Sequence, residues 1–264
     1  YYIYILFKKY AKELTQIDST PIISGVGNFM INKKVARSGL KTGETIEETI
    51  NYLASRKGNK KVSDIKKIAL VIPAVDILDS KEYIFTNKIP ENAERKEQYI
   101  TDISIGKAVR ASSSFPVVFS PCEYKKHRFL DGGVLDNIPV TEVKKQGADK
   151  VLAINFKADD IDEHSNIMDI TMRTIDIMGN KISEESLEQS DYVLTIQTDK
   201  TGLLDVEKME SCYQYGYKAV LLATNTGIIH SEWRTKDGVK TADVSPLLMC
   251  EFGSGLRAKN PMNV

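Results

Sequence analysis

Apolar residues follow two spacings along this chain, one typical of helices and one typical of strands. Over residues 1–14 they recur every three or four positions, which is the period of a half-buried helix. Over residues 66–77 and 149–156 they form nearly continuous runs of strand length, which predict strands buried on both faces. The chain is therefore expected to combine helices and strands in an α/β fold.

The expected elements alternate along the chain. We expect helices at residues 46–57, 104–113, 140–146, 167–186 and 210–223, and further strands at 81–87, 126–131 and 190–198. A strand, helix, strand order is typical of parallel strands joined by crossover helices. The sequence thus predicts a three-layer fold, in which a mostly parallel sheet has helices on both faces.

The first of these helices carries its own start and stop signals. Thr45 and Glu48 have the spacing of a capping box, in which each side chain bonds to a free backbone N–H of the first turn. Gly58 follows the last apolar position and is expected to end the helix.

No internal repeat, low-complexity run or linker-like stretch divides the chain. Its 264 residues are enough for one large domain with a buried core. We expect a single α/β domain over residues 1–224. Beyond it the periodic pattern fades, and residues 225–264 form a tail to which the sequence assigns no role.

Charge and cysteine content exclude several classes of function. The 36 basic and 36 acidic side chains balance, so no net field favours nucleic acid as a partner. The three cysteines form neither a CxxC motif nor a disulfide framework, which favours a cytoplasmic location and predicts no metal site. The apolar runs are shorter than the roughly 20 residues of a membrane span, so we expect at most transient contact with a membrane surface.

Candidate chemistry is concentrated in the stretch FLDGGVLDNIPV, residues 129–140. Asp131 follows a predicted strand, and the ends of strands are where functional groups of α/β sheets gather. Gly132 and Gly133 can adopt positive φ and can let another part of the backbone pass close to the carboxylate. Taken alone, Asp-Gly is also a common turn in which the carboxylate only caps the backbone.

The longer segment over residues 108–140 resembles the second signature block of the patatin-like phospholipases. The positions that match, in order and at the family's spacing, are Arg110, Ala111, Ser112, Pro116, Phe119, Pro121, Asp131, Gly132, Gly133, Asp136, Asn137 and Pro139. The strand that ends at Asp76 is also similar to a strand of that family, with Val75 where threonine is usual. The resemblance covers about residues 1–220.

The resemblance implies a serine lipid acyl hydrolase that uses a Ser-Asp dyad and needs no cofactor. Asp131 would accept the proton of the nucleophilic serine, and Gly132 and Gly133 would support its loop. The chain departs from the family because it contains no Gly-x-Ser-x-Gly elbow and no glycine-rich oxyanion loop. We expect both to lie upstream of Tyr1, so that this chain carries the acid and not the nucleophile.

Two other interpretations stay open. The chain can belong to a catalytically inactive relative that keeps the fold as a lipid-binding or interaction module. It can also be an unrelated α/β binding domain in which Asp131 caps a turn. The hydrolase would take a lipid or ester substrate as its partner.

Other polar residues are interpreted as structural. The serines at 112–114 lack flanking glycines and are expected to cap the end of a helix. Asp136 is expected to form a turn or a cap before Pro139, and Asp76 either orients loops near the active site or caps a turn. The three histidines have no companion ligand at helical spacing and are interpreted as solvated or satisfied within the core: His127, His164 and His230.

Overall fold

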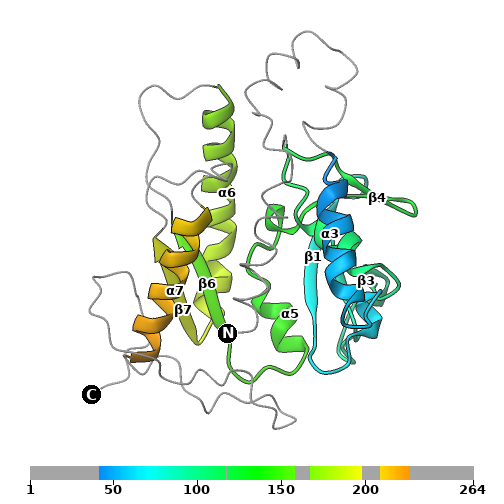
Figure 1. Ribbon diagram of the computed structural model, residues 1–264, viewed down its shortest axis with the longest axis horizontal. Coiled ribbons are helices and arrows are strands. Elements are labelled where there is room, and N and C mark those ends of the chain that lie inside the picture. Colours follow the sequence, from blue (N-terminus) through cyan, green and yellow to red (C-terminus); the bar gives the residue numbers. More distant parts are fainter. Residues whose placement is uncertain (1–41, 117, 158–166, 198–208, 226–264) are drawn as a thin grey trace. The chain divides into compact units, whose positions relative to one another are not determined.

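The structure is a computed structural model that describes residues 42–116, 118–157, 167–197 and 209–225 (Figure 1). The expected helix over residues 1–14, the tail beyond 225, and two of the histidines lie outside these described residues. The chain divides into two compact units, Tyr1–Asn137 and Ile138–Val264. This division falls inside the domain predicted over residues 1–224, which stays a prediction.

The first unit is built on a five-stranded sheet with the order β3-β2-β1-β5-β4. Its strands are β1 (Val71–Asp76), β2 (Lys81–Thr86), β3 (Tyr99–Ile100), β4 (Cys122–Tyr124) and β5 (His127–Asp131). β1 is the central strand and pairs with β2 on one side and β5 on the other.

The α/β class is confirmed, but this sheet is mixed rather than mostly parallel. β1 runs antiparallel to both of its neighbours, β4 and β5 are antiparallel, and only β2 and β3 pair in parallel. A tight turn joins β1 to β2, with Ser80 at a φ of 57°. An apolar run marks a central strand of either kind, so the run at 66–77 could not distinguish a hairpin from a crossover.

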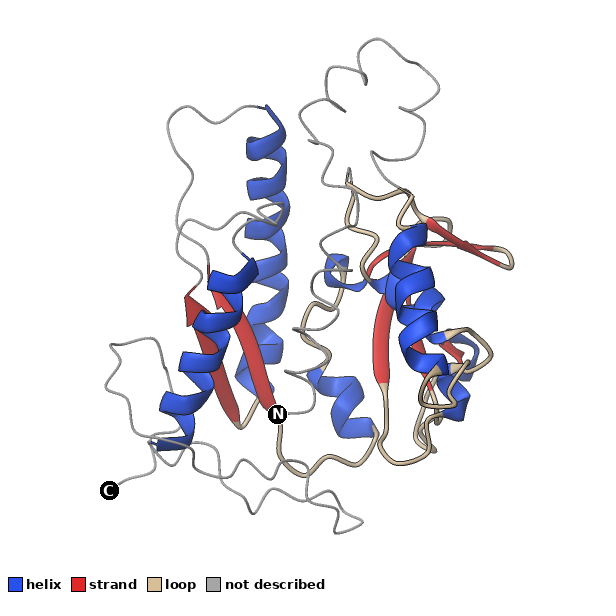
Figure 2. Ribbon diagram, in the orientation of Figure 1, coloured by secondary structure: helices blue, strands red, loops and turns tan. Residues whose placement is uncertain are grey.

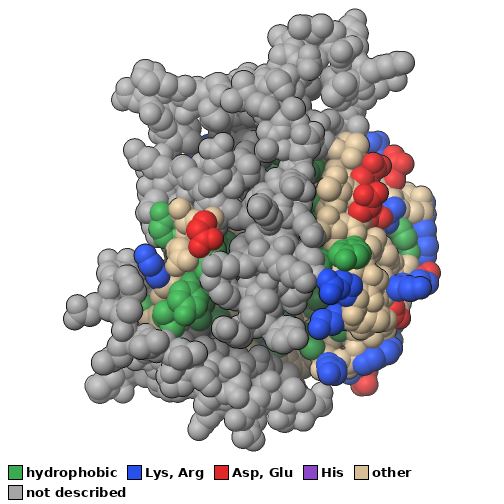
Figure 3. Space-filling model, in the orientation of Figure 1, with side chains coloured by type: hydrophobic (Ala, Val, Ile, Leu, Met, Phe, Trp, Pro, Cys, Tyr) green, Lys and Arg blue, Asp and Glu red, His purple; other side chains and the backbone are tan. Residues whose placement is uncertain are grey.

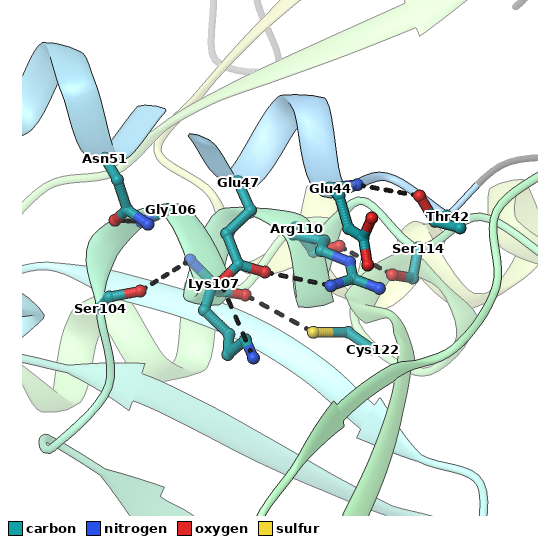
Figure 4. Close-up of polar contacts among 10 residues, drawn as sticks. All are labelled: Thr42, Glu44, Glu47, Asn51, Ser104, Gly106, Lys107, Arg110, Ser114 and Cys122. Carbon is teal, nitrogen blue, oxygen red and sulfur yellow. Dashed lines mark hydrogen bonds and ion pairs between the residues drawn. The ribbon is translucent and has the colours of Figure 1, made fainter. Parts of the chain in front are cut away.

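Two helices of the first unit pack against each other beside the sheet. They are α3 (Glu44–Ser55) and α4 (Ile105–Ser112), accompanied by single 3-10 turns at Val62–Asp64, Lys96–Gln98 and Gly132–Val134. The helices touch at Gly106, where an added Cβ would lie 2.1 Å from the carbonyl oxygen of Glu47. The Asn51 side chain accepts a hydrogen bond from the Gly106 N–H at 2.9 Å at the same place (Figure 4).

The helix predicted from residue 46 begins earlier, at Glu44, whereas the predicted start of α4 near Ser104 is confirmed. α3 begins at Glu44 after Gly43, whose φ is 74°, so Thr45 lies within the first turn and does not cap the helix. Glutamates in that turn favour the helix through its dipole. α4 begins after Ser104, whose hydroxyl oxygen accepts a hydrogen bond from the Lys107 N–H at 3.2 Å.

The core of the first unit lies between α4 and the sheet. Small residues on α4 allow close approach, and large side chains on β2 and β5 fill the space. Phe85 and Phe129 are fully buried with ring centroids 5.1 Å apart in an edge-to-face contact. The buried cluster comprises Val62, Ala74, Tyr83, Phe85, Ile103, Ala108, Ala111, Cys122 and Phe129.

The second unit has the parallel pairing that the sequence predicts. β6 (Leu152–Lys157) and β7 (Tyr192–Gln197) form a parallel pair, with α6 (Ile167–Gln189) between them in the chain. α7 (Met209–Asn225) packs on the strands through Ala223 and buries Leu194 and Ile196 (Figure 2). The short α5 (Val140–Lys145) opens this unit.

Candidate active site

Strand β5 ends at Asp131, which is the predicted catalytic residue. Asp131 lies opposite Ala74 of β1, and its backbone N–H donates a hydrogen bond to the Ser114 carbonyl at 3.1 Å. Ser114 follows the last turn of α4, so a strand on one side and a helix end on the other fix the backbone of Asp131. The acid therefore stands at the C-terminal end of β5, with its backbone bonded to the segment that follows α4.

The Asp131 carboxylate is held through one of its two oxygens. Oδ1 accepts a hydrogen bond from the Gly133 N–H at 2.8 Å, and no donor to Oδ2 is found among the described residues. Burial raises the pKa of Asp131, and the Gly133 hydrogen bond opposes that rise only in part. A partly desolvated carboxylate with one open oxygen is suited to accept a proton.

Other atoms lie too close to Gly132 and Gly133 to leave room for a side chain, and this contact, not the backbone conformation, requires glycine there. Neither has a positive φ, which corrects the expectation from the sequence. An added Cβ at Gly132 would lie 2.4 Å from the Pro73 carbonyl oxygen of β1. At Gly133 it would lie 2.9 Å from Asn137 Oδ1 and 3.1 Å from Asp131 Oδ1.

Asp76 lies at the other end of the pairing between β1 and β5. It is opposite Phe129 and accepts hydrogen bonds from the Leu78 N–H at 3.0 Å and the Arg128 N–H at 3.1 Å. Its Oδ2 lies 2.6 Å from Nδ1 of His127. The structure therefore does not bring Asp76 to Asp131: the carboxylate caps the turn after β1, as the second of the two sequence interpretations holds.

Burial and hydrogen bonding act in opposite directions on Asp76. Burial alone would raise its pKa, but the bonds from Leu78, His127 and Arg128 outweigh burial, and the pKa lies below the ordinary value. The side chain of His127 is also mostly buried, and its ring stacks on Phe129. The sequence missed this pair because it depends on the register between β1 and β5, which no local pattern reports.

Ser114, the last of the three serines at the end of α4, caps the helix as predicted. Ser114 is only 1% exposed, and its hydroxyl donates a hydrogen bond to the Arg110 carbonyl at 2.8 Å. A hydroxyl committed to the last turn of a helix is poorly placed to attack a substrate.

Ion pairs link α4 to α3. Glu47 of α3 lies 3.1 Å from Nη1 of Arg110 and 3.7 Å from Nζ of Lys107, both on α4 (Figure 4). Arg110, one of the residues that carry the resemblance, thus holds the helix whose end supports Asp131. On the face that Figure 3 shows, acidic and basic side chains are interspersed over the described residues.

Comparison with known proteins places this site in a family. A model of the patatin-like phospholipases matches residues 7–144, just over half of the chain, including the Asp-Gly-Gly turn. The chain belongs to the patatin-like phospholipase family. The patatin-like fold predicted from the sequence is thereby confirmed, with the mixed sheet described above.

Several curated relatives share this segment at low identity. The chain is 28% identical over 135 residues to a protein named lysophospholipase NTE1 of Lodderomyces elongisporus, a match over 41% of this chain and 9% of the relative. It is 30% identical over 124 residues to uncharacterized protein YqhO of Bacillus subtilis, over 46% and 41% of the two chains. A probable lipid hydrolase, 463L of Invertebrate iridescent virus 6, is 26% identical over 144 residues, over 53% and 44%.

The matched part spans less than half the length of each of these relatives. Among the helices that the structure describes, none combines the length and the apolar character that crossing a membrane requires.

Proposed function

We propose that this chain is the acid-bearing part of a serine lipid acyl hydrolase, in which Asp131 is the general base of a Ser-Asp dyad. The observation that carries the proposal is the state of the Asp131 carboxylate: one oxygen is fixed by the Gly133 N–H and the other is open among the described residues. Membership of the patatin-like phospholipases and the names of two relatives support a lipid ester as the substrate.

In each half of the reaction, the Asp131 carboxylate accepts one proton and then donates it. Oδ2 of Asp131 accepts the proton of the serine hydroxyl as the serine oxygen bonds to the ester carbonyl carbon. The proton then passes to the leaving alcohol as the ester bond breaks. In the second half of the reaction, Asp131 takes a proton from water, which attacks the acyl-serine, and returns it to the serine oxygen.

The serine itself must come from outside the 264 residues, which contain no Gly-x-Ser-x-Gly elbow. We propose that this elbow and the oxyanion loop precede Tyr1. The second candidate function is a patatin-like module that binds lipid without hydrolysing it. That module would keep the Asp131 turn as structure and would have no reactive serine.

The test uses the full-length protein with a fluorophosphonate probe and phosphatidylcholine vesicles that contain lysophosphatidylcholine. We expect the probe to label one serine upstream of Tyr1, located by mass spectrometry, and to abolish release of fatty acid from the vesicles. Vesicle binding without labelling and without fatty acid release would overturn the hydrolase and support the binding module. Labelling at residues 112–114 would overturn the assignment of the nucleophile to an upstream segment.

A further inference from the structure

A second polar side chain, that of Asn137, lies beside Gly133 as the Asp131 carboxylate does. The place of a Gly133 Cβ lies within about 3 Å of both Asn137 Oδ1 and Asp131 Oδ1, at 2.9 Å and 3.1 Å. The amide and the carboxylate therefore border the same small space, which exists because residue 133 has no side chain.

The loop after β5 turns back on itself and brings Asn137 to this place. The N–H groups of Leu135 and Asp136 both donate to the Gly132 carbonyl, at 3.1 Å and 2.9 Å. Gly132 is in turn pressed against the backbone of β1 at Pro73. These backbone contacts fix the path of the loop as far as Asp136, the residue before Asn137.

Among the residues that the structure describes, the groups that contact Asp131 are uncharged. β1 presents Ala74, the end of α4 presents the carbonyl of Ser114, and the loop presents the Gly133 N–H. Burial raises the pKa of Asp131 and the Gly133 hydrogen bond lowers it, with no contribution from a charged side chain of the described residues. Asp136 is the ionisable neighbour within the loop.

We propose that Asn137 is a positioning residue for Asp131, which holds the carboxylate in one orientation and keeps an uncharged group beside it. The inference rests on the proposed function and adds a role for a side chain that does not itself exchange a proton. An amide restricts rotation of the neighbouring carboxylate without changing its charge. A carboxylate in the same place would repel Asp131 and raise its pKa.

The test is the pH profile of kcat/KM for the full-length Asn137→Asp variant, measured with a p-nitrophenyl ester. We expect the acidic limb to move upward by about one pH unit, as for two adjacent carboxylates. Asn51→Asp is the matched control. The Asn51 side-chain oxygen accepts a hydrogen bond from the Gly106 N–H near the start of α4. A negative charge is favourable there, and the profile should stay that of the wild type.

A second variant covers the case in which Asn137→Asp does not fold. Asn137→Ala should lower kcat by about tenfold and leave KM unchanged, because the carboxylate loses its orientation and not its charge. An unchanged kcat in Asn137→Ala, or an Asn137→Asp profile that superimposes on the wild type while Asp131→Asn is inactive, would overturn the positioning role alone. A fully active Asp131→Asn variant would overturn the proposed function together with it.

Discussion

The two ends of the β1–β5 pairing each carry a carboxylate, and the two are held in opposite ways. Asp76 is 2% exposed and has three hydrogen-bond partners, two backbone N–H groups and His127. The Asp131 carboxylate is partly buried and has one hydrogen-bond partner among the described residues, the Gly133 N–H. The pKa of Asp76 is lowered, whereas burial raises that of Asp131.

This difference separates a structural acid from a candidate catalytic one. A carboxylate whose oxygens are all engaged stabilises the fold in its ionised form and has no reason to take up a proton near neutral pH. A carboxylate that is desolvated and half-satisfied is less stable when ionised, which is the property that a general base needs. The same residue type is therefore suited to two different roles on two neighbouring strands.

The largest expected effect is on catalysis. In the full-length protein, Asp131→Asn should lower kcat by about 10²–10⁴-fold, since the serine loses its proton acceptor. Asp76→Asn should leave kcat within a few-fold of the wild type, provided that both variants are compared as folded protein by circular dichroism. Equal losses of kcat in the two variants would contradict the assignment of different roles to Asp131 and Asp76.

The next effect concerns the turn that supports Asp131. Gly132→Ala should lower the free energy of unfolding by about 2–4 kcal/mol, because its methyl group collides with the rigid Pro73 carbonyl. Gly133→Ala should cost less stability, since it meets side-chain atoms of Asn137 and Asp131, but should still reduce activity. Urea denaturation of both variants measures the order, and a harmless Gly132→Ala would contradict the close contact.

Removal of the structural acid should destabilise the fold. Asp76→Asn should lower the free energy of unfolding by about 1–3 kcal/mol at pH 7, because hydrogen bonds to a charged acceptor are lost. A lowered pKa in the folded state means that this stabilisation is present above the ordinary pKa, about 3.9, and is lost as pH falls through the folded value. Urea midpoints of the variant and the wild type should therefore converge in acid.

Removal of the candidate base should change the free energy of unfolding in the opposite direction, and by the smallest amount of these variants. Asp131→Asn keeps an oxygen for the Gly133 N–H but removes a buried charge, so stability at pH 7 should rise by about 0.5–2 kcal/mol. Because the folded pKa is raised, the wild type loses stability as pH climbs from the ordinary value through the folded one. The gain should vanish below about pH 4, and a loss of stability at pH 7 would contradict the account.

Local patterns predicted the elements of this protein better than their pairing. The strand ending at Asp131, the helix beginning near Ser104 and the parallel pair of the second unit were all predicted from the sequence. The antiparallel setting of β1 was not, because a central strand has the same apolar run whichever way its neighbours point. The role of Gly132 was likewise only half predicted, since its contact with Pro73 is made across strands.

The candidate site shows the same limit. Asp131 could be found from its motif, and the capping role of Ser114 from its place at a helix end. The pair of Asp76 with His127 and the approach of Asn137 to Asp131 depend on register and on the path of a loop. Such contacts are set by tertiary packing, which the spacing of residues along the chain does not encode.

The most direct test of the central claim is the rate at which a fluorophosphonate labels the catalytic serine in the full-length wild type, Asp131→Asn and Asp76→Asn proteins at pH 7. This rate reports the activation of the serine without depending on the identity of the lipid substrate. We predict that labelling slows by at least about 100-fold in Asp131→Asn and is unchanged in Asp76→Asn. Equal labelling rates in the wild type and Asp131→Asn would contradict the assignment of Asp131 as the base.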